Sequence, residues 1–404
     1  MGDLKTTIGR AMAPVMTGKQ IMFVMAGVSD HFQRLAGIKS EVMFSDADVN
    51  TEIACLAAEY LGMTPAFSWD TYNFEARALG QGVVTAEYGL PDIDYSNPII
   101  RSEADLDKLH WPTENPLDAG NYPLLFKQAE LANKYFGYTI RVFSQAVSSF
   151  TLACELCGFS GFMAMIKRKP DLANEIMRRI VDDIHTPLVK AVAERFPGIR
   201  IMFADAWEMI PNISPKVQKE FVWKYYDRLL ENTKDMNAHL CWYMTYGESC
   251  MPDPEAYLLA KSKYSYQITC ANTENMPYDL YVSAAKKGGL NLNVQIPADV
   301  IMDGPEEAII EYTRKVAKEM RCQVDKFSWM ALCPASAPTS HIRAVMAAGN
   351  AFSVLPCPTE EEIDAIQVTV PPETETFEAF CRCKAVENPE GYTFKWLDQA
   401  KFIG

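Results

Sequence analysis

Short apolar runs alternate with longer amphipathic stretches along most of this 404-residue chain. The runs predict strands, and the stretches, whose apolar residues recur with helical spacing, predict helices. Strands are predicted over residues 20–26, 66–70, 139–146, 199–207, 238–246, 264–271, 290–297 and 327–333. Most are followed by a predicted helix, and this alternation is the pattern of an α/β fold of the TIM (β/α)8 barrel type.

The predicted helices fill the intervals between these strands. They cover residues 46–63, 150–158, 169–196, 215–234, 254–262, 277–287, 305–320 and 340–348. The helix over 169–196 is expected to break near Pro187. Residues 1–50 predict a helical N-terminal segment around the first strand, residues 103–137 are largely helical, and residues 80–98 predict an irregular surface excursion. A doubly wound sheet is the alternative, but the glycine-rich phosphate turn that usually follows its early strand is missing.

The end of the chain departs from this alternation. It begins with an acidic run, Glu360–Glu362, and ends in an aromatic-bearing tail. We therefore expect residues 1–357 to form one barrel domain and residues 358–404 to form a C-terminal extension packed on it. A contact between two copies of the chain is one expected use of this extension, so a homodimer is among the expected states.

Composition and charge narrow the class of protein. Hydrophobic residues make up 49% of the chain and charged residues 22%, which is the balance of a soluble globular enzyme. The net charge of −14 repels phosphate backbones and disfavours a nucleic acid partner. No apolar run of about 18 residues predicts a membrane span. The N-terminus lacks the apolar core of a signal peptide, so the 11 cysteines are expected to be reduced thiols in a cytoplasmic protein.

The candidate chemistry begins with His239-Leu240-Cys241 on the fifth predicted strand. Side chains two residues apart on a strand share a face, so this segment can offer an imidazole and a thiolate to one zinc ion. A second thiolate is available from Cys333, at the end of the last predicted strand. The competing interpretation is a buried histidine beside a cysteine that packs as a small hydrophobe.

Other polar and aromatic residues stand at the ends of the predicted strands, where TIM barrels carry their chemistry. In chain order they are Asp70, Asn73, Gln145, Asp205, Trp207, Glu208, His239, Cys241, Tyr243, Tyr246, Asn272, Glu274, Gln295 and Cys333. Three ligands of the His/Cys/Cys type around an open fourth position describe a catalytic zinc site. Cys154 and Cys157 lie in an apolar helical pattern and are expected to pack in the core. Cys381 and Cys383 lie in the tail without a histidine nearby, so they are not expected to bind metal.

Several titratable residues keep more than one interpretation. Asp205 suits a general acid or base, a carboxylate that orients His239, or a satisfied polar group at a strand end. Glu75 could reach the metal or pair with Arg77. The histidines at 31, 110 and 185 fall in predicted helical or loop segments and are expected at the surface or as caps.

Four segments resemble the uroporphyrinogen decarboxylase superfamily. They are Phe150–Ala153, Asn212–Pro215, Asp303–Glu307 and Pro334–Pro338. The resemblance covers about residues 20–350 and implies a TIM barrel. The decarboxylase itself is disfavoured, because its arginine-rich N-terminal motif has no counterpart at Phe23–Ser29.

The chain is more similar to the corrinoid-dependent methyltransferase branch of that superfamily. There, a His-x-Cys on one strand and a Cys before the last helix bind zinc, and His239, Cys241 and Cys333 match that pattern. One subgroup methylates coenzyme M; another demethylates a donor such as a methoxylated aromatic. The chain differs from the shorter coenzyme M enzymes by its tail and by Trp207, Trp242, Tyr243 and Tyr246. These rings favour an aromatic donor, unless they fill the core.

The resemblance therefore implies a zinc-dependent methyltransferase that takes the methyl group of a small-molecule donor, a phenyl methyl ether, and passes it to cobalamin on a separate corrinoid protein. Asp205 and Glu208 are the expected catalytic acids. Asp70, Asn73, Trp207, Tyr243 and Tyr246 are expected to contact the donor. The alternatives are a methylcobamide:thiol methyltransferase, a decarboxylase with another substrate, and a non-catalytic zinc scaffold.

Overall fold

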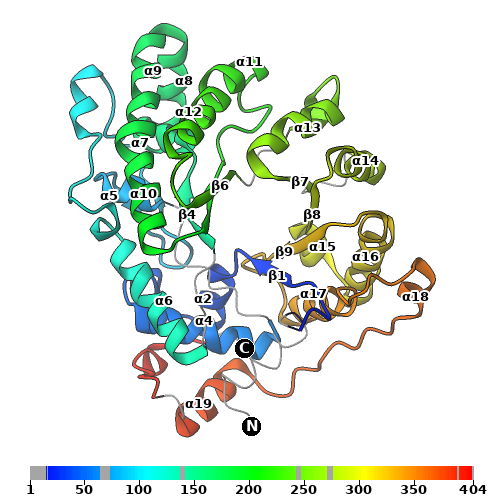
Figure 1. The fold of residues 1–404 in the computed structure, drawn as a ribbon. Coiled ribbons are helices and arrows are strands. Elements are labelled where there is room, and N and C mark those ends of the chain that lie inside the picture. Colours follow the sequence, from blue (N-terminus) through cyan, green and yellow to red (C-terminus); the bar gives the residue numbers. More distant parts are fainter. Residues whose placement is uncertain are drawn as a thin grey trace.

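A computed structural model gives the fold (Figure 1). It describes residues 15, 17–63, 73–136, 142–242, 247–270, 276–388 and 391–402. Parallel strands alternate with helices along the chain, and Figure 1 shows the strands at the centre with helices around them. The predicted α/β class with parallel strands is confirmed.

Within the described residues the parallel strands form two sheets. The four-stranded sheet has the order β1-β9-β8-β7, and the three-stranded sheet has the order β4-β5-β6. Their strands are β1 (Phe23–Ala26), β4 (Val142–Val147), β5 (Ile199–Ala204), β6 (Ala238–Trp242), β7 (Gln267–Cys270), β8 (Asn291–Ile296) and β9 (Phe327–Leu332). Hydrogen bonds among these strands do not join one sheet to the other. The predicted strand over 66–70 lies outside the described residues.

Helices follow the strands as the alternation predicts. The N-terminal helices are α2 (Ser29–Ala36), α3 (Ser40–Met43), α4 (Ala47–Leu61), α5 (Phe74–Ala78) and α6 (Tyr122–Phe136). Those around the three-stranded sheet are α7 (Ser149–Cys157), α8 (Phe159–Arg168), α9 (Pro170–Arg179), α10 (Thr186–Arg195), α11 (Pro215–Val217) and α12 (Lys224–Thr233). Those around the other sheet are α13 (Pro254–Ser265), α14 (Tyr278–Gly288), α15 (Ala298–Asp303), α16 (Glu306–Glu319) and α17 (Thr339–Ala351).

Short helical turns complete the connections. The 3-10 helices are η1 (Glu103–Lys108), η2 (Pro116–Asp118), η5 (Glu248–Cys250), η6 (Arg321–Gln323) and η7 (Leu397–Gln399). Two segments are π-helical, namely η3 (Ile180–His185) and η4 (Gln218–Trp223). The α-helix is interrupted just before Pro187, as predicted, by the π-helical turns of η3, and these wider turns accommodate the missing proline N–H at the start of α10.

Each sheet packs against its helices through its own hydrophobic cluster. In the four-stranded sheet, Phe23 of β1 meets Trp329 of β9 edge to face, with ring centroids 5.2 Å apart. In the three-stranded sheet, Trp242 at the end of β6 stacks on Tyr226 of α12 at 4.1 Å and on Phe203 of β5 at 5.4 Å. Trp242 therefore packs in the core of this sheet.

Two differences from the expected elements have local causes. The strand predicted over 264–271 begins only at Gln267, because α13 continues to Ser265. The excursion over 80–98 contains an antiparallel hairpin, β2 (Val83–Val84) with β3 (Asp92–Ile93). The strands β2 and β3 are too short for hydrophobic periodicity to predict.

The C-terminal residues contain α18 (Glu360–Ala365) and α19 (Phe377–Glu387) and return to α4. The buried carboxylate of Glu52 accepts hydrogen bonds from the backbone of Thr393 and Phe394 and from Nε1 of Trp396. Lys384 pairs with Glu59 at 2.9 Å. These contacts fasten residues 377–402 to α4, whereas the domain boundary at residue 357 stays a prediction.

In the described part of the chain, no single helix is long and apolar enough to cross a membrane. The bent pair α7 and α8 passes by length and composition, but its helices meet at 104° and α7 is buried in the core.

Candidate functional site

The His-x-Cys pair lies on β6, at the edge of the three-stranded sheet. His239 is in register with Arg200 of β5, and Cys241 is in register with Met202. Leu240 and the strand's last residue point into the hydrophobic cluster, so His239 and Cys241 share the opposite face. His239 is exposed, and Cys241 is 7% exposed. The strand therefore presents an imidazole and a thiol side by side.

Cys333 follows β9 in the other sheet. Its backbone N–H donates to the Ala26 oxygen at 2.8 Å, and its side chain is 7% exposed within the cluster that also holds Trp329 and Ala331. Among the residues that the structure describes, no three His, Cys, Asp or Glu side chains are grouped to hold a metal ion. The structure brings His239 and Cys241 together but not Cys333, and the three-ligand zinc centre stays a prediction.

Both candidate thiols are protonated at neutral pH. Burial raises the pKa of Cys241 to about 11, although Arg200 opposes the shift. Burial, with the nearby charge of Asp30, raises the pKa of Cys333 to about 12. A metal binds the thiolate, so zinc would have to displace a proton from each sulfur.

The connection after β5 carries Asp205, Trp207 and Glu208. Asp205 and Glu208 are fully buried. The Glu208 carboxylate accepts hydrogen bonds from the hydroxyls of Ser148, of Thr151 at 2.6 Å and of Tyr226 at 2.9 Å. Burial raises the pKa of Glu208, and these three donors oppose the shift. This carboxylate is saturated by the protein itself, which suits a positioning role.

Thr151 extends that network to the backbone of the same connection. Its Oγ1 donates to Glu208 and accepts from the N–H groups of Ala206 at 3.0 Å and Trp207 at 3.2 Å. Because Ser148 caps α7 through the Thr151 N–H, the start of α7 and the 205–208 connection form one rigid unit. This unit fixes the position of Asp205.

The predicted substrate contacts are only partly placed. Trp207 is half-buried and stacks on Phe159 at 5.1 Å, with Tyr95 edge-on at 5.8 Å. Asn73 is buried at the start of α5. Asp70, Tyr243 and Tyr246 lie outside the described residues. Trp207 thus belongs to an aromatic group beside the β5 connection.

A second buried polar group was not expected from the sequence. Nδ1 of His185 lies 3.0 Å from the Ser149 hydroxyl, and Nε2 lies 3.8 Å from Glu75. Burial raises the pKa of Glu75 to about 8 and lowers that of His185 to about 3, so both groups are mainly neutral at pH 7. The surface placement expected for His31 and His185 is wrong, whereas His110 is exposed. The burial of His185 could have been inferred from its apolar sequence neighbours, which include Val181 and Ile184.

A third group lies beyond β6. The hydroxyl of Tyr281 donates to Glu248 at 2.6 Å, and Lys261 of α13 is buried nearby. Burial lowers the pKa of Lys261, and the charges of Glu248 and Asp205 oppose the shift. Asp205 therefore shares an electrostatic environment with a buried lysine.

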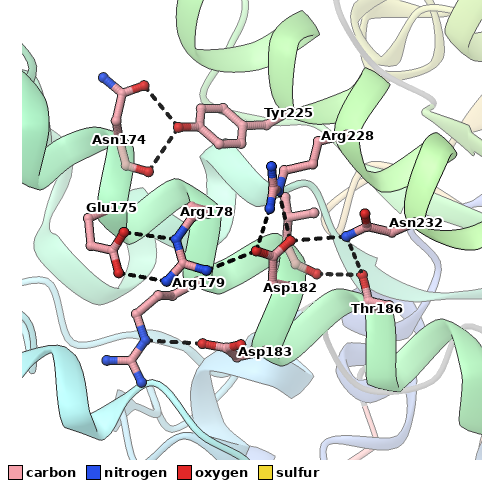
Figure 2. A network of polar contacts seen from close by, with 11 residues as sticks. Asn174, Glu175, Arg178, Arg179, Asp182, Asp183, Thr186, Tyr225, Arg228 and Asn232 are labelled. Atoms are coloured by element: carbon pink, nitrogen blue, oxygen red, sulfur yellow. Dashed lines mark hydrogen bonds and ion pairs between the residues drawn. The ribbon is translucent and has the colours of Figure 1, made fainter.

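Of two surface clefts, one lies close to the candidate ligand Cys333 and the other lies between two outer helices. One, of ≈ 560 Å³, lies beside the loop after Cys333 and is lined by Arg34, Tyr88 and Lys401 among others. The other, of ≈ 440 Å³, lies between α9 and α12. Of the charges that line it, Glu175 and Arg178 pair with each other, and Figure 2 shows the adjacent Asp182 accepting from Arg178, Arg228 and Asn232. That network holds η3 to α12 and is structural.

Comparison with known proteins adds the relatives of this fold. The family model of uroporphyrinogen decarboxylase matches residues 11–252. Among solved structures, the chain is similar to a methyltransferase from Methanosarcina mazei, with a TM-score of 0.63 and 14% sequence identity. That similarity covers 87% of this chain and 99% of the other, and at this identity it shows the fold alone. In sequence, no curated protein matches the chain.

Proposed function

The chain belongs to the uroporphyrinogen decarboxylase family, and we propose that it is a zinc-dependent methyltransferase that moves the methyl group of a methoxylated aromatic to the cobalamin of a separate corrinoid protein. The observation that carries the proposal is the pair His239 and Cys241 on one face of β6. The methyltransferase named among the structures of the same fold supports it.

The donor set suits zinc. An imidazole and two thiolates are common zinc ligands, and a site with three protein ligands keeps a position open for substrate. His239 and Cys241 would hold the ion from β6, and Cys333 would be the third ligand, an assignment that rests on the resemblance. When bound, zinc supplies a Lewis acid for the ether oxygen or a neighbouring hydroxyl of the donor.

The other residues would bind the donor and manage its proton. The ring of Trp207, already stacked on Phe159, offers a face for an aromatic donor. Asp205 would hold the proton that the departing phenolate needs, because the three hydroxyls bind the other buried carboxyl of this connection, Glu208. Glu208 would keep Asp205 in place through Thr151. The corrinoid protein would dock at the carboxyl ends of the strands.

The test measures zinc and methyl transfer in the same preparations. Purified protein is mixed with a reduced corrinoid protein and a panel of methoxyaromatics, methylamines and methyl thiols, and methylation of the cobalt is followed by absorbance. We expect turnover with methoxyaromatics, and a loss of zinc and of at least about a hundredfold in rate in Cys333→Ser. Cys55→Ser, at a thiol that is also buried but lies in α4, should keep both.

The same assay separates the alternatives. Methylation of an added thiol by the methylated corrinoid protein, with no demethylation of any ether, would identify a methylcobamide:thiol methyltransferase. Release of CO₂ without methyl transfer would identify a decarboxylase. Full zinc content without either activity would favour a zinc-bound scaffold. Retention of zinc and activity in Cys333→Ser would contradict the proposed site.

A further inference from the structure

Two cysteines far from the strand-end site lie next to each other where the C-terminal segment leaves the barrel. Cys322 belongs to η6, between α16 and β9, and Cys357 follows α17. Their sulfur atoms are 3.8 Å apart. Both residues lie in connections on the amino-terminal side of β9, whereas Cys333 follows its carboxyl end.

The backbone around this thiol pair is held on both sides. The Arg321 guanidinium donates to the backbone oxygens of Phe352 and Val354. Nε2 of Gln323 donates to the Glu360 carboxylate at 3.1 Å. The residues flanking Cys322 are thus tied to the residues before and after Cys357, and this frame keeps the two sulfurs close without a covalent bond.

The two thiols differ in access. Cys357 is exposed, whereas Cys322 is half-buried and its thiol lies 3.2 Å from the Pro358 oxygen. Burial, together with the adjacent Cys357 sulfur, raises the pKa of Cys322 to about 12. Cys357 is therefore the thiol that a reagent in solution meets first, and Cys322 is the thiol placed to react second.

We propose that Cys322 and Cys357 form a reversible disulfide by exchange with a low-molecular-weight disulfide such as oxidised glutathione. The Cys357 thiolate attacks one sulfur of the reagent and releases one small thiol, which leaves a mixed disulfide on Cys357. The Cys322 thiolate then attacks the Cys357 sulfur and releases the second small thiol. The reagent gains two electrons and the two protons, and the protein loses them.

Closing the bond requires the sulfurs to approach from 3.8 Å to about 2 Å. The covalent loop would enclose β9, Cys333 and α17, the last strand and helix of the barrel. Because a disulfide restricts the unfolded chain, the oxidised protein should unfold at a temperature several degrees higher than the reduced protein. This inference does not depend on the proposed function.

The test follows each thiol by mass spectrometry. The full-length reduced protein is incubated with oxidised glutathione, quenched with an alkylating agent and digested. We expect a cross-linked peptide pair that joins Cys322 to Cys357, with no lasting glutathione on either. Cys250 is exposed and serves as the control thiol, which should keep its glutathione adduct. In Cys322→Ser, the adduct on Cys357 should persist as well.

Two readouts decide the outcome. A glutathione adduct that persists on Cys357 of the wild type, as on Cys250, would overturn the proposal, and so would two free thiols after the control thiol has reacted. The rise in unfolding temperature should disappear on addition of dithiothreitol and should be absent in Cys357→Ser. An equal rise in that variant would assign the effect to another cysteine.

Discussion

The connection after β5 and the face of β6 that carries His239 and Cys241 belong to neighbouring strands, but their polar groups differ in how the protein binds them. Glu208 is fully buried, and three hydroxyls of the protein donate to its carboxylate. His239 is exposed, and within the described residues no side-chain hydrogen bond holds its imidazole or the Cys241 thiol. The Glu208 carboxylate is bonded by the protein itself, whereas His239 and Cys241 offer ligand atoms. Stability and chemistry should therefore separate between them.

The largest expected loss of stability comes from Glu208→Ala. The substitution leaves the hydroxyls of Ser148, Thr151 and Tyr226 without their shared acceptor in a buried site. Removing one partner of such a network costs about 3–5 kcal/mol. Urea denaturation measures the loss, with Glu220→Ala, at an exposed carboxylate of η4, as the matched control. A loss below about 1 kcal/mol would mean that the network is not structural.

The next effect depends on pH and comes from Glu75. Its pKa is about 8 in the folded protein and near the ordinary 4.5 in the unfolded chain. Between these values the folded state keeps a proton that the unfolded state releases, so this carboxyl lowers stability as pH rises. Relative to Glu75→Gln, the free energy of unfolding of the wild type should fall by up to about 1.4 kcal/mol for each pH unit in this window. Urea denaturation at about pH 5 and about pH 8 measures the free energy of unfolding of both proteins. The same change with pH in both proteins would contradict the assigned pKa.

A smaller effect is expected from Thr151→Val, which keeps the shape of the side chain. It removes one donor to Glu208 and the acceptor for the N–H groups of Ala206 and Trp207. We expect a loss of about 1–3 kcal/mol, and a change in the rate of methyl transfer because Asp205 moves with the connection. Thr151→Ser should restore both, since it keeps the hydroxyl. A rate unchanged in Thr151→Val would disconnect the network from Asp205.

The smallest effect on stability is expected at the face that carries the chemistry. His239→Ala removes an exposed side chain and should change the free energy of unfolding of the metal-free protein by no more than about 0.5 kcal/mol. The same variant should lose zinc and methyl transfer. A large loss of stability without metal would instead place His239 in a structural role.

The periodicity of the chain predicted most of the fold. The alternation gave the positions of β4, β5, β6, β8 and β9 within a few residues, because long amphipathic helices separate them. The resemblance to the uroporphyrinogen decarboxylase superfamily is confirmed by the family match. The hairpin of β2 and β3 was missed because each strand has only two residues. The tail helices α18 and α19 were missed although Thr359 and Thr376 cap them locally.

The candidate site was less predictable. The spacing of His239 and Cys241 is enough to place both on one face, because strand alternation is local. The saturation of Glu208 could not be predicted, since its donors come from α7 and α12, about 60 residues before and 18 residues after it. His185 is buried because η3 packs against Phe203 of β5, and its apolar sequence neighbours could have indicated this burial.

The most direct measurement is X-ray absorption at the zinc edge of the purified protein, with Cys55→Ser and Cys333→Ser beside the wild type. We predict two sulfur ligands at about 2.3 Å and at least one nitrogen ligand at about 2.0 Å in the wild type and in Cys55→Ser. In Cys333→Ser, we predict one sulfur ligand fewer or no bound zinc. A wild-type zinc ion without sulfur ligands, or a sulfur count unchanged in Cys333→Ser, would contradict a centre built from His239, Cys241 and Cys333.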